Sequence, residues 1–273
     1  MLRTLFPTER CRGTFNSSVR GGGGGLGRAL ASLLITRGSA VFLCDRSSED
    51  LEKVVGDLKR EFPEGKVGLS PLDVRSLPGW DKAWDECVDQ LGSPAVVINI
   101  AGVKGEEDWE QTYDVNIKGV HNGIVTSHKY LSRETGGSGG IVVNISSTAG
   151  VTCIGDMFAT PAYTASKHAV SALTRTFGHK FWYNRTGVSV IAVAPFYIDT
   201  PFIGEWKDWT PDTEAQKELE KSAAGKKILS PGEAALKIFN TFRAESGSIW
   251  LLRSGMFPPF NIPDYKLPQP KIL

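Results

Sequence analysis

Short apolar segments alternate with longer segments of helical period along most of the chain. The apolar segments have strand length, and those that are apolar on both faces suit the central strands of a parallel sheet. They are 41–44, 67–69, 95–100, 141–145, 188–193 and 249–252. The segments that predict helices are 26–37, 48–61, 80–91, 109–133, 162–185 and 231–244. This alternation is typical of βαβ units and predicts an α/β fold, a Rossmann-type doubly wound parallel sheet of about seven strands with helices on both faces.

Two parts of the chain depart from this pattern. The segment expected to form the first strand, 14–19, is polar and poorly suited to a central parallel position. We therefore treat 1–20 as a divergent N-terminal segment and 21–273 as a single Rossmann-fold domain. Residues 199–230 hold two tryptophans among charged residues and contain no strand-like run, so we expect them to form a lid over a binding site.

Composition and charge exclude several classes of protein. The 273 residues include 31 basic and 30 acidic side chains, and 41% of them are apolar. A disordered chain is excluded, and a net charge of +1 supplies no field that would attract a nucleic acid or an anionic membrane. The four cysteines form no C-x-x-C pair, so we expect neither a metal site nor a disulfide framework. The expected partner is a small molecule.

The expected location is the cytoplasm, because the cysteine usage is that of a reduced intracellular protein and no apolar run reaches the length of a membrane span. Four arginines lie in the first twenty residues with a single acidic residue, Glu9, among them. A mitochondrial transit segment is therefore the alternative.

A glycine run, Gly21 to Gly25 followed by Leu26 and Gly27, opens the first predicted helix. Glycines let backbone N–H groups approach a pyrophosphate at the positive end of a helix. A flexible linker is the alternative interpretation of such a run.

Asp45 closes the strand that follows this helix, where a carboxylate can accept hydrogen bonds from both ribose hydroxyls of a dinucleotide. The cofactor is then NAD, because the 2′-phosphate of NADP would face a like charge. Arg46 would soften that repulsion, and a strand-end or helix-capping role is the alternative for Asp45.

Tyr163 and Lys167 stand four residues apart in a segment of helical period, which places both side chains on one helix face. A free tyrosine has a pKa of about 10 and is a poor base at neutral pH. A cation about 4 Å away favours the phenolate by up to ~4 kcal/mol and would prepare the phenol for proton transfer. An ordinary surface pair is the alternative.

Polar residues also follow two of the predicted strands. Ser146 and Ser147 end the strand 141–145, at the carboxyl edge where open α/β sheets bind ligands, although serines there also cap turns. Asn99 ends the strand before it, and Asn116 lies among apolar neighbours in a predicted helix, where its amide needs a partner.

Together these residues resemble the short-chain dehydrogenase/reductase family, in its NAD-linked group of 15-hydroxyprostaglandin dehydrogenase-like and insect alcohol dehydrogenase-like proteins. The resemblance is strong from about Gly21 to Thr200 and looser beyond. The cofactor-binding positions that it implies are Gly21, Gly25, Leu26, Gly27, Asp45, Asp73, Val74, Asn99, Ala101, Gly102, Tyr163, Lys167, Pro195, Ile198 and Thr200. Among them, Asp73 and Val74 would meet the adenine, and Ile198 and Thr200 the carboxamide.

The resemblance also implies four catalytic residues. Tyr163 would be the general acid/base, and Lys167 would lower the pKa of its phenol and hold the nicotinamide ribose. Ser147, rather than Ser146, would orient the substrate oxygen, and Asn116 would position a water that links Lys167 to solvent.

Three positions depart from the family pattern. Arg20 replaces a threonine before the first glycine, Phe196 replaces the glycine of a Pro-Gly pair, and Ile100 replaces the second asparagine of an Asn-Asn pair. The segment between Ser147 and Tyr163 is also longer than in relatives near the prostaglandin enzyme.

The resulting hypothesis is an NAD-dependent alcohol dehydrogenase that interconverts a secondary alcohol and a ketone. The residues expected to form an apolar wall for a lipid-like substrate, or else to cover the edge of the core, are Phe202, Ile203, Trp206, Trp209, Met256 and Phe257. A non-catalytic binding or storage protein and an NADPH-dependent carbonyl reductase are the alternatives. The resemblance implies a homodimer or homotetramer formed through 109–133 and 162–185.

Overall fold

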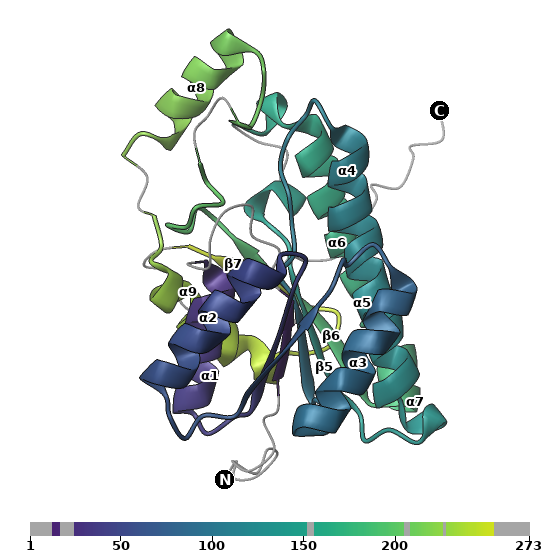
Figure 1. Cartoon of the computed structure of the whole chain (residues 1–273). Coiled ribbons are helices and arrows are strands. Elements are labelled where there is room, and N and C mark those ends of the chain that lie inside the picture. Colours follow the sequence, from purple (N-terminus) through teal and green to yellow (C-terminus); the bar gives the residue numbers. More distant parts are fainter. Residues whose placement is uncertain (1–12, 17–24, 152–155, 205–207, 226–227, 254–273) are drawn as a thin grey trace, which may run out of the picture.

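The computed structural model describes residues 13–16, 25–151, 156–204, 208–225 and 228–253 (Figure 1). In this part of the chain, seven strands pair in parallel in the order β3-β2-β1-β4-β5-β6-β7. The strands are β1 (Gly13–Asn16), β2 (Val41–Asp45), β3 (Val67–Pro71), β4 (Val96–Asn99), β5 (Gly140–Ile145), β6 (Val188–Pro195) and β7 (Ile249–Leu252). The chain winds outward from β1 on one side and from β4 on the other, which confirms the predicted doubly wound α/β fold.

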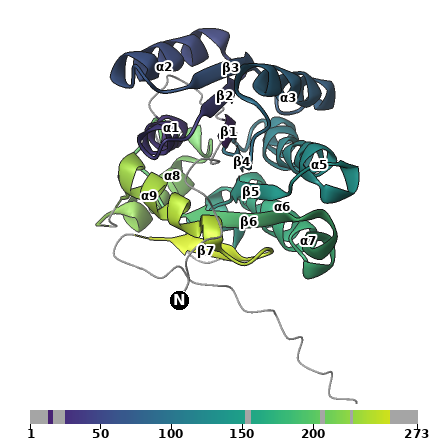
Figure 2. The same cartoon turned by 90° about the horizontal axis from the view of Figure 1, so that it is seen from below.

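Helices cover both faces of the sheet (Figure 2). The helices on one face are α1 (Leu26–Thr36), α2 (Ser48–Glu61) and α9 (Pro231–Asn240), and those on the other are α3 (Leu77–Leu91), α5 (Val120–Leu131) and α6 (Pro161–Phe177). Each layer has its own apolar core. Leu30, Leu58 and Ile238 belong to the first and are fully buried. Ile124 and Val170 occupy the same place in the second.

Two of the predicted helices are interrupted. The predicted helix 109–133 consists of α4 (Trp109–Tyr113), a π-helical segment (Asp114–Gly119) and α5. The predicted helix 162–185 divides into α6 and α7 (Lys180–Thr186), because the backbone leaves the helical conformation at His179, with ψ of 141°. Gly178, just before it, packs closely on Gly247, since a Cβ atom on Gly178 would lie 2.3 Å from the Gly247 backbone nitrogen. His179 then begins the new helix by accepting the Phe181 N–H.

Strand β1 (Gly13–Asn16) lies within residues 1–20, which the polar sequence led us to treat as separate from the domain. It lies in the middle of the sheet, where Phe15 is in register with Leu43 of β2 on one side and with Ile98 of β4 on the other. The predicted strand 14–19 is thus placed at Gly13–Asn16. Arg20 and Gly21 lie outside the described residues.

The two ends of the segment after β6 are joined by an isolated parallel bridge between Ile198 and Leu229, outside the seven strands. Helix α8 (Thr213–Ala223) lies between these two residues, at the same end of the molecule as α4 (Figure 1). The segment expected to be a lid therefore contains a helix and is closed at its base by backbone pairing. None of the described helices is long and apolar enough to cross a lipid bilayer.

Candidate active site

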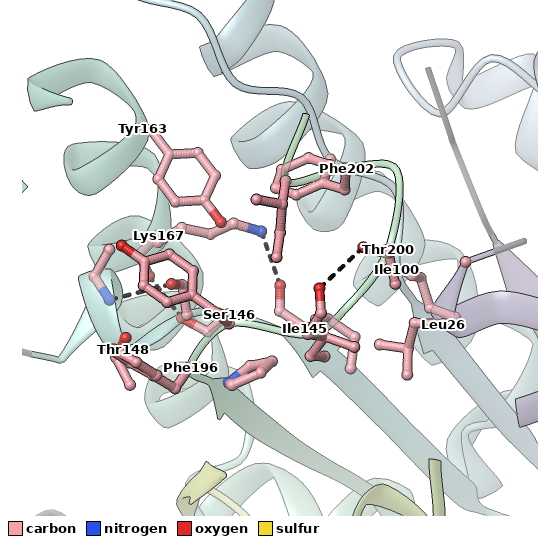
Figure 3. Close-up of a pocket in the computed structure, with 18 of the residues that line it drawn as sticks. Leu26, Ile100, Ile145, Ser146, Thr148, Tyr163, Lys167, Phe196, Thr200 and Phe202 are labelled. Carbon is pink, nitrogen blue, oxygen red and sulfur yellow. Dashed lines mark hydrogen bonds between the residues drawn. The ribbon is translucent and has the colours of Figure 1, made fainter. Parts of the chain in front are cut away.

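A cavity of about 150 Å³ opens at the carboxyl ends of β5 and β6. The residues that line it are Gly25, Leu26, Gly27, Ile100, Gly102, Ile145, Ser146, Ser147, Thr148, Ala149, Thr160, Tyr163, Lys167, Pro195, Phe196, Tyr197, Ile198, Thr200, Phe202, Ile203, Trp209 and Leu219. The Tyr163 phenol oxygen and the Lys167 ammonium lie side by side on one side of it, and Leu26 and Ile100 lie on the other (Figure 3). The start of α1, the carboxyl edge of the sheet, the start of α6 and the lid therefore meet at one place.

Helix α6 supplies the phenol and the amine. Pro161 occupies its first turn, where a missing N–H costs nothing, and the helix then runs without a break past Lys167. Both side chains are buried, Tyr163 with 6% and Lys167 with 3% of its surface exposed. The Lys167 ammonium lies 5.6 Å from the centre of the Tyr163 ring and donates a hydrogen bond of 2.9 Å to the Ile145 carbonyl oxygen.

Burial dominates the titration of both groups. Loss of hydration disfavours the phenolate and raises the pKa of Tyr163 to about 12, although its hydrogen bond with Ser147 opposes this increase. The same loss disfavours the ammonium and lowers the pKa of Lys167 to about 8. The sequence predicts a lowered pKa for the Tyr163 phenol, whereas burial raises it in this structure. An effect of Lys167 on this pKa stays a prediction.

The two serines after β5 have different partners. The Ser147 hydroxyl forms a hydrogen bond with the Tyr163 side chain and accepts the Ala149 N–H at 3.2 Å. The Ser146 hydroxyl instead donates to the Lys167 carbonyl oxygen at 3.1 Å. Ser147 thus lies beside the phenol, whereas Ser146 holds the backbone of α6 against the sheet.

Asn116 is fully buried in the π-helical segment, and its amide has several partners. Its Oδ1 accepts the Val103 N–H at 2.8 Å, and its Nδ2 donates to the Val103 carbonyl and to the Ser166 hydroxyl. A Cβ atom on Gly102 would lie 3.4 Å from this Oδ1 and 3.5 Å from the Lys167 ammonium. Asn116 therefore lies behind Gly102, next to the cavity but outside its lining.

Asn99 and Ala101, both predicted to bind the cofactor, do not line the cavity. Ala101 packs in the core under α3 and α5. The Asn99 side chain donates to Asn144 at 2.8 Å, and Asn144 donates in turn to Thr174 at 2.9 Å. These buried amides connect β4, β5 and α6.

The start of α1 fits the pyrophosphate of a dinucleotide. No side chain caps this helix at Gly25, and its first turn contains no acidic residue. The N–H groups in the first turn of a helix have no acceptor within that helix. In α1 this turn includes Leu26 and Gly27, and both residues line the cavity. Asp45 stands at the end of the adjacent strand with 8% of its surface exposed, and it accepts the Ser47 N–H at 3.1 Å. The helix start and the Asp45 carboxylate thus have the chemistry that the pyrophosphate and the ribose of a dinucleotide would require.

The remaining predicted cofactor residues fall into two groups. Asp73 and Val74 lie after β3, outside the cavity lining. Arg75 binds the Asp73 carboxylate through two nitrogens and lowers its pKa. Pro195, Ile198 and Thr200 line the cavity after β6. Trp206, Met256 and Phe257 lie outside the described residues, whereas Phe202, Ile203 and Trp209 line the cavity as expected.

Two charged residues of the loop after β4 were missed by the sequence reasoning. Lys104 donates to the Ile203 carbonyl oxygen, and its ammonium lies 4.5 Å from the centre of the Trp209 ring, so it fastens the lid. The Glu106 carboxylate accepts the Ala162 and Tyr163 N–H groups at the start of α6. No local sequence signal marks either residue, because both contacts join segments far apart in the chain.

Comparison with known proteins identifies the family of the chain. The family model for short chain dehydrogenases matches residues 18–211. The mouse NAD(+)-dependent 15-hydroxyprostaglandin dehydrogenase is 32% identical in a match that covers 68% of this chain and 68% of the mouse enzyme. The rat enzyme is 31% identical, and the match covers 91% of this chain and 94% of the rat enzyme. Levodione reductase of Leifsonia aquatica is 31% identical over 68% of this chain and 70% of its own.

A solved structure of a levodione reductase superposes with a TM-score of 0.74 at 26% identity and covers 90% of this chain and 97% of its own. The sequence match and the shared architecture agree. The chain belongs to the short-chain dehydrogenase family of oxidoreductases.

Proposed function

We propose that this protein is an NAD-dependent alcohol dehydrogenase that interconverts a secondary alcohol and a ketone on an apolar substrate. The observation that carries the proposal is the buried Tyr163 phenol, which forms a hydrogen bond with Ser147 beside the Lys167 ammonium at the cavity. A substrate oxygen that contacts the phenol and the serine hydroxyl would be fixed and supplied with a proton. The names of the relatives, a hydroxyprostaglandin dehydrogenase and a levodione reductase, agree with alcohol and ketone chemistry.

The protonation of Tyr163 favours one direction of the proposed reaction. With a pKa of about 12 the phenol keeps its proton at neutral pH, so Tyr163 acts as a general acid toward a ketone oxygen. In the opposite direction the phenol must first release its proton, and alkaline pH makes this easier. Oxidation of the alcohol should therefore have the more alkaline pH optimum.

The cofactor would be held by Gly25, Leu26 and Gly27 at its pyrophosphate and by Asp45 at its adenosine ribose. When bound, NAD supplies the acceptor for the hydride that leaves the carbinol carbon. Lys167 would hold the nicotinamide ribose, while Pro195 and Ile198 would enclose the nicotinamide end. The Asp45 carboxylate favours NAD, because it would repel a 2′-phosphate.

We propose an apolar substrate because the lid contributes apolar side chains to the lining of the cavity. Phe202, Trp209 and Leu219 come from the lid and contribute apolar surface to the cavity. Rings of the first two surround Tyr163, with centres 6.2 and 5.7 Å from its own. An alcohol with a hydrocarbon chain or ring system therefore suits this wall better than a sugar.

The proposal is tested by replacing Tyr163 with phenylalanine. The variant keeps the ring and its packing but has no proton to transfer, so turnover of secondary alcohols with NAD should fall by about 10²-fold or more. NADH binding, measured by fluorescence titration, should not change. Tyr183→Phe removes the hydroxyl of a tyrosine that is 44% exposed on α7 and serves as the control. Equal turnover of Tyr163→Phe and the wild type would refute the assignment.

A second candidate, an NADPH-dependent carbonyl reductase, is favoured by Arg46. Its charge lies close enough to lower the pKa of Asp73, so Arg46 stands beside the region proposed for the adenosine ribose. Reduction of a ketone is measured side by side with NADH and NADPH. A higher kcat/KM with NADPH would favour this candidate over the NAD enzyme.

Two further measurements concern the binding-protein alternative and the oligomeric state. Absence of NADH binding at millimolar concentration would favour a non-catalytic binding or storage protein. We propose a homodimer or homotetramer, in keeping with the family resemblance of 109–133 and 162–185. Sedimentation at micromolar concentration tests this, and a monomeric mass would contradict it.

A further inference from the structure

The start of helix α6 is held by a residue from outside the helix. Its N-cap residue, Thr160, makes no side-chain capping hydrogen bond, and the first turn contains no acidic side chain. The Glu106 carboxylate takes over this function, since Oε2 accepts the Ala162 N–H at 2.7 Å and Oε1 accepts the Tyr163 N–H at 3.1 Å. A negative charge at this end of a helix is also favoured by the helix dipole.

The carbonyl side of Tyr163 is held as well. The Ser166 hydroxyl donates to the Tyr163 carbonyl oxygen at 2.7 Å and accepts from Asn116 Nδ2 at 3.0 Å. Asn116 binds both the N–H and the carbonyl of Val103, which lies three residues before Glu106. These hydrogen bonds and the backbone between Val103 and Glu106 therefore form a closed ring, which runs from Asn116 along the loop to Glu106, on to Tyr163 and Ser166, and back to Asn116.

The loop inside this ring has one more anchor. The Thr112 hydroxyl donates to the Gly105 carbonyl oxygen at 3.0 Å, next to Glu106. The loop therefore cannot shift freely between Val103 and Glu106, and the carboxylate presents its two oxygens to α6 from a fixed place. The backbone of Tyr163 is thereby held on both its N–H and its C=O side.

We propose that Glu106 is a positioning residue for the reaction, and this inference rests on the proposed function. Its carboxylate fixes the first turn of α6 so that the Tyr163 phenol lies beside Ser147 and Lys167. Glu106 does not line the reaction cavity, so it acts through Tyr163 rather than on the substrate. A displacement of the phenol by about 1 Å costs on the order of 10²-fold in rate.

The test compares Glu106→Ala and Glu106→Gln with Glu107→Ala, which removes an exposed carboxylate one residue further along the same loop. Glu106→Ala should lower kcat by roughly 10-fold to 10²-fold. Glu106→Gln keeps one carbonyl oxygen as an acceptor and should lose less. KM and the dissociation constant of NADH should stay within about twofold of the wild type, because no residue that lines the cavity is replaced. Glu107→Ala should behave as the wild type.

Hydrogen exchange gives a readout that does not depend on turnover. Amide exchange in the peptide that spans 160–166 should be faster in Glu106→Ala than in Glu107→Ala. Ser166→Ala releases the opposite side of Tyr163 and should lower kcat in the same way, which keeps the test decisive if Glu106→Ala does not fold. The double variant should lose less than the product of the two single losses, because both act on one ring of contacts.

Equal kcat in Glu106→Ala and Glu107→Ala would overturn the inference. The same holds if Glu106→Gln is as slow as Glu106→Ala, or if exchange at 160–166 does not respond. Failure of the proposed function has a different signature, since wild type and Tyr163→Phe would then have equal turnover while the exchange at 160–166 would still respond to Glu106→Ala.

Discussion

Replacing Lys167 with methionine tests whether the reaction cavity holds a strongly desolvated amine. Lys167 is 3% exposed, and burial lowers its pKa from 10.5 to about 8. The unfolded chain keeps this proton up to about pH 10.5, whereas the folded chain releases it near pH 8. Between these values the unfolded state binds more protons, so raising the pH stabilises the folded protein.

The size of this effect follows from the pKa difference. The free energy of unfolding should rise by about 2 to 3 kcal/mol between pH 7 and pH 10, since each pKa unit corresponds to ~1.36 kcal/mol. Methionine has nearly the same shape and does not titrate, so the Lys167→Met variant should lack this rise. Other groups, including Lys104 and Tyr163, are present in both proteins and cancel in the difference.

The assay is urea unfolding at five pH values from 7 to 10, at constant ionic strength and protein concentration. The difference in free energy of unfolding, wild type minus Lys167→Met, should increase with pH. Lys82→Met removes a lysine whose side chain is 69% exposed and should give a difference that is flat with pH. A flat difference for Lys167→Met as well would refute the reasoning, because the amine would then titrate alike in the folded and unfolded chains.

Two further predictions concern the cofactor and the packing of α5. Asp45→Asn should lower the ratio of kcat/KM for NAD to that for NADP by about tenfold or more, because it removes the carboxylate that repels a 2′-phosphate; an unchanged ratio would contradict this. Gly123→Ala should lower the free energy of unfolding by about 1–3 kcal/mol, because the added Cβ would lie 2.3 Å from Asn99 Oδ1. Gly56→Ala, where nothing lies within 4 Å, should instead raise it by about 0.5–1 kcal/mol, and equal effects of the two in thermal unfolding would argue against the close packing.

The strands were predictable from the sequence because a sheet covered on both faces requires continuous apolar segments. The interruption of the predicted helix 109–133 was not predictable. Its π-helical segment contains Asn116, whose amide reaches Val103 and Ser166, and these contacts exist only in the folded chain. The position of β1 was also missed in part, since its pairing with β2 and β4 does not depend on an apolar sequence.

The candidate site was predictable where its residues are neighbours along the chain. Tyr163 and Lys167 lie one turn apart on α6, so their proximity follows from helix geometry. The titration of Tyr163 was predicted in the wrong direction, because the degree of burial depends on the lid and the sheet together. Glu106 was missed because its contacts with Ala162 and Tyr163 span more than fifty positions of the sequence.

The buried amides of Asn99 and Asn144, with the Thr174 hydroxyl, have a consequence for how this sequence can vary. Each side chain is a partner of the next, so an apolar replacement of Asn144 would leave an amide donor on Asn99 and a hydroxyl on Thr174 without that partner, out of reach of water. Substitutions at these three positions are therefore expected to occur together. Relatives that lack one of these polar groups should carry compensating apolar residues at the other two.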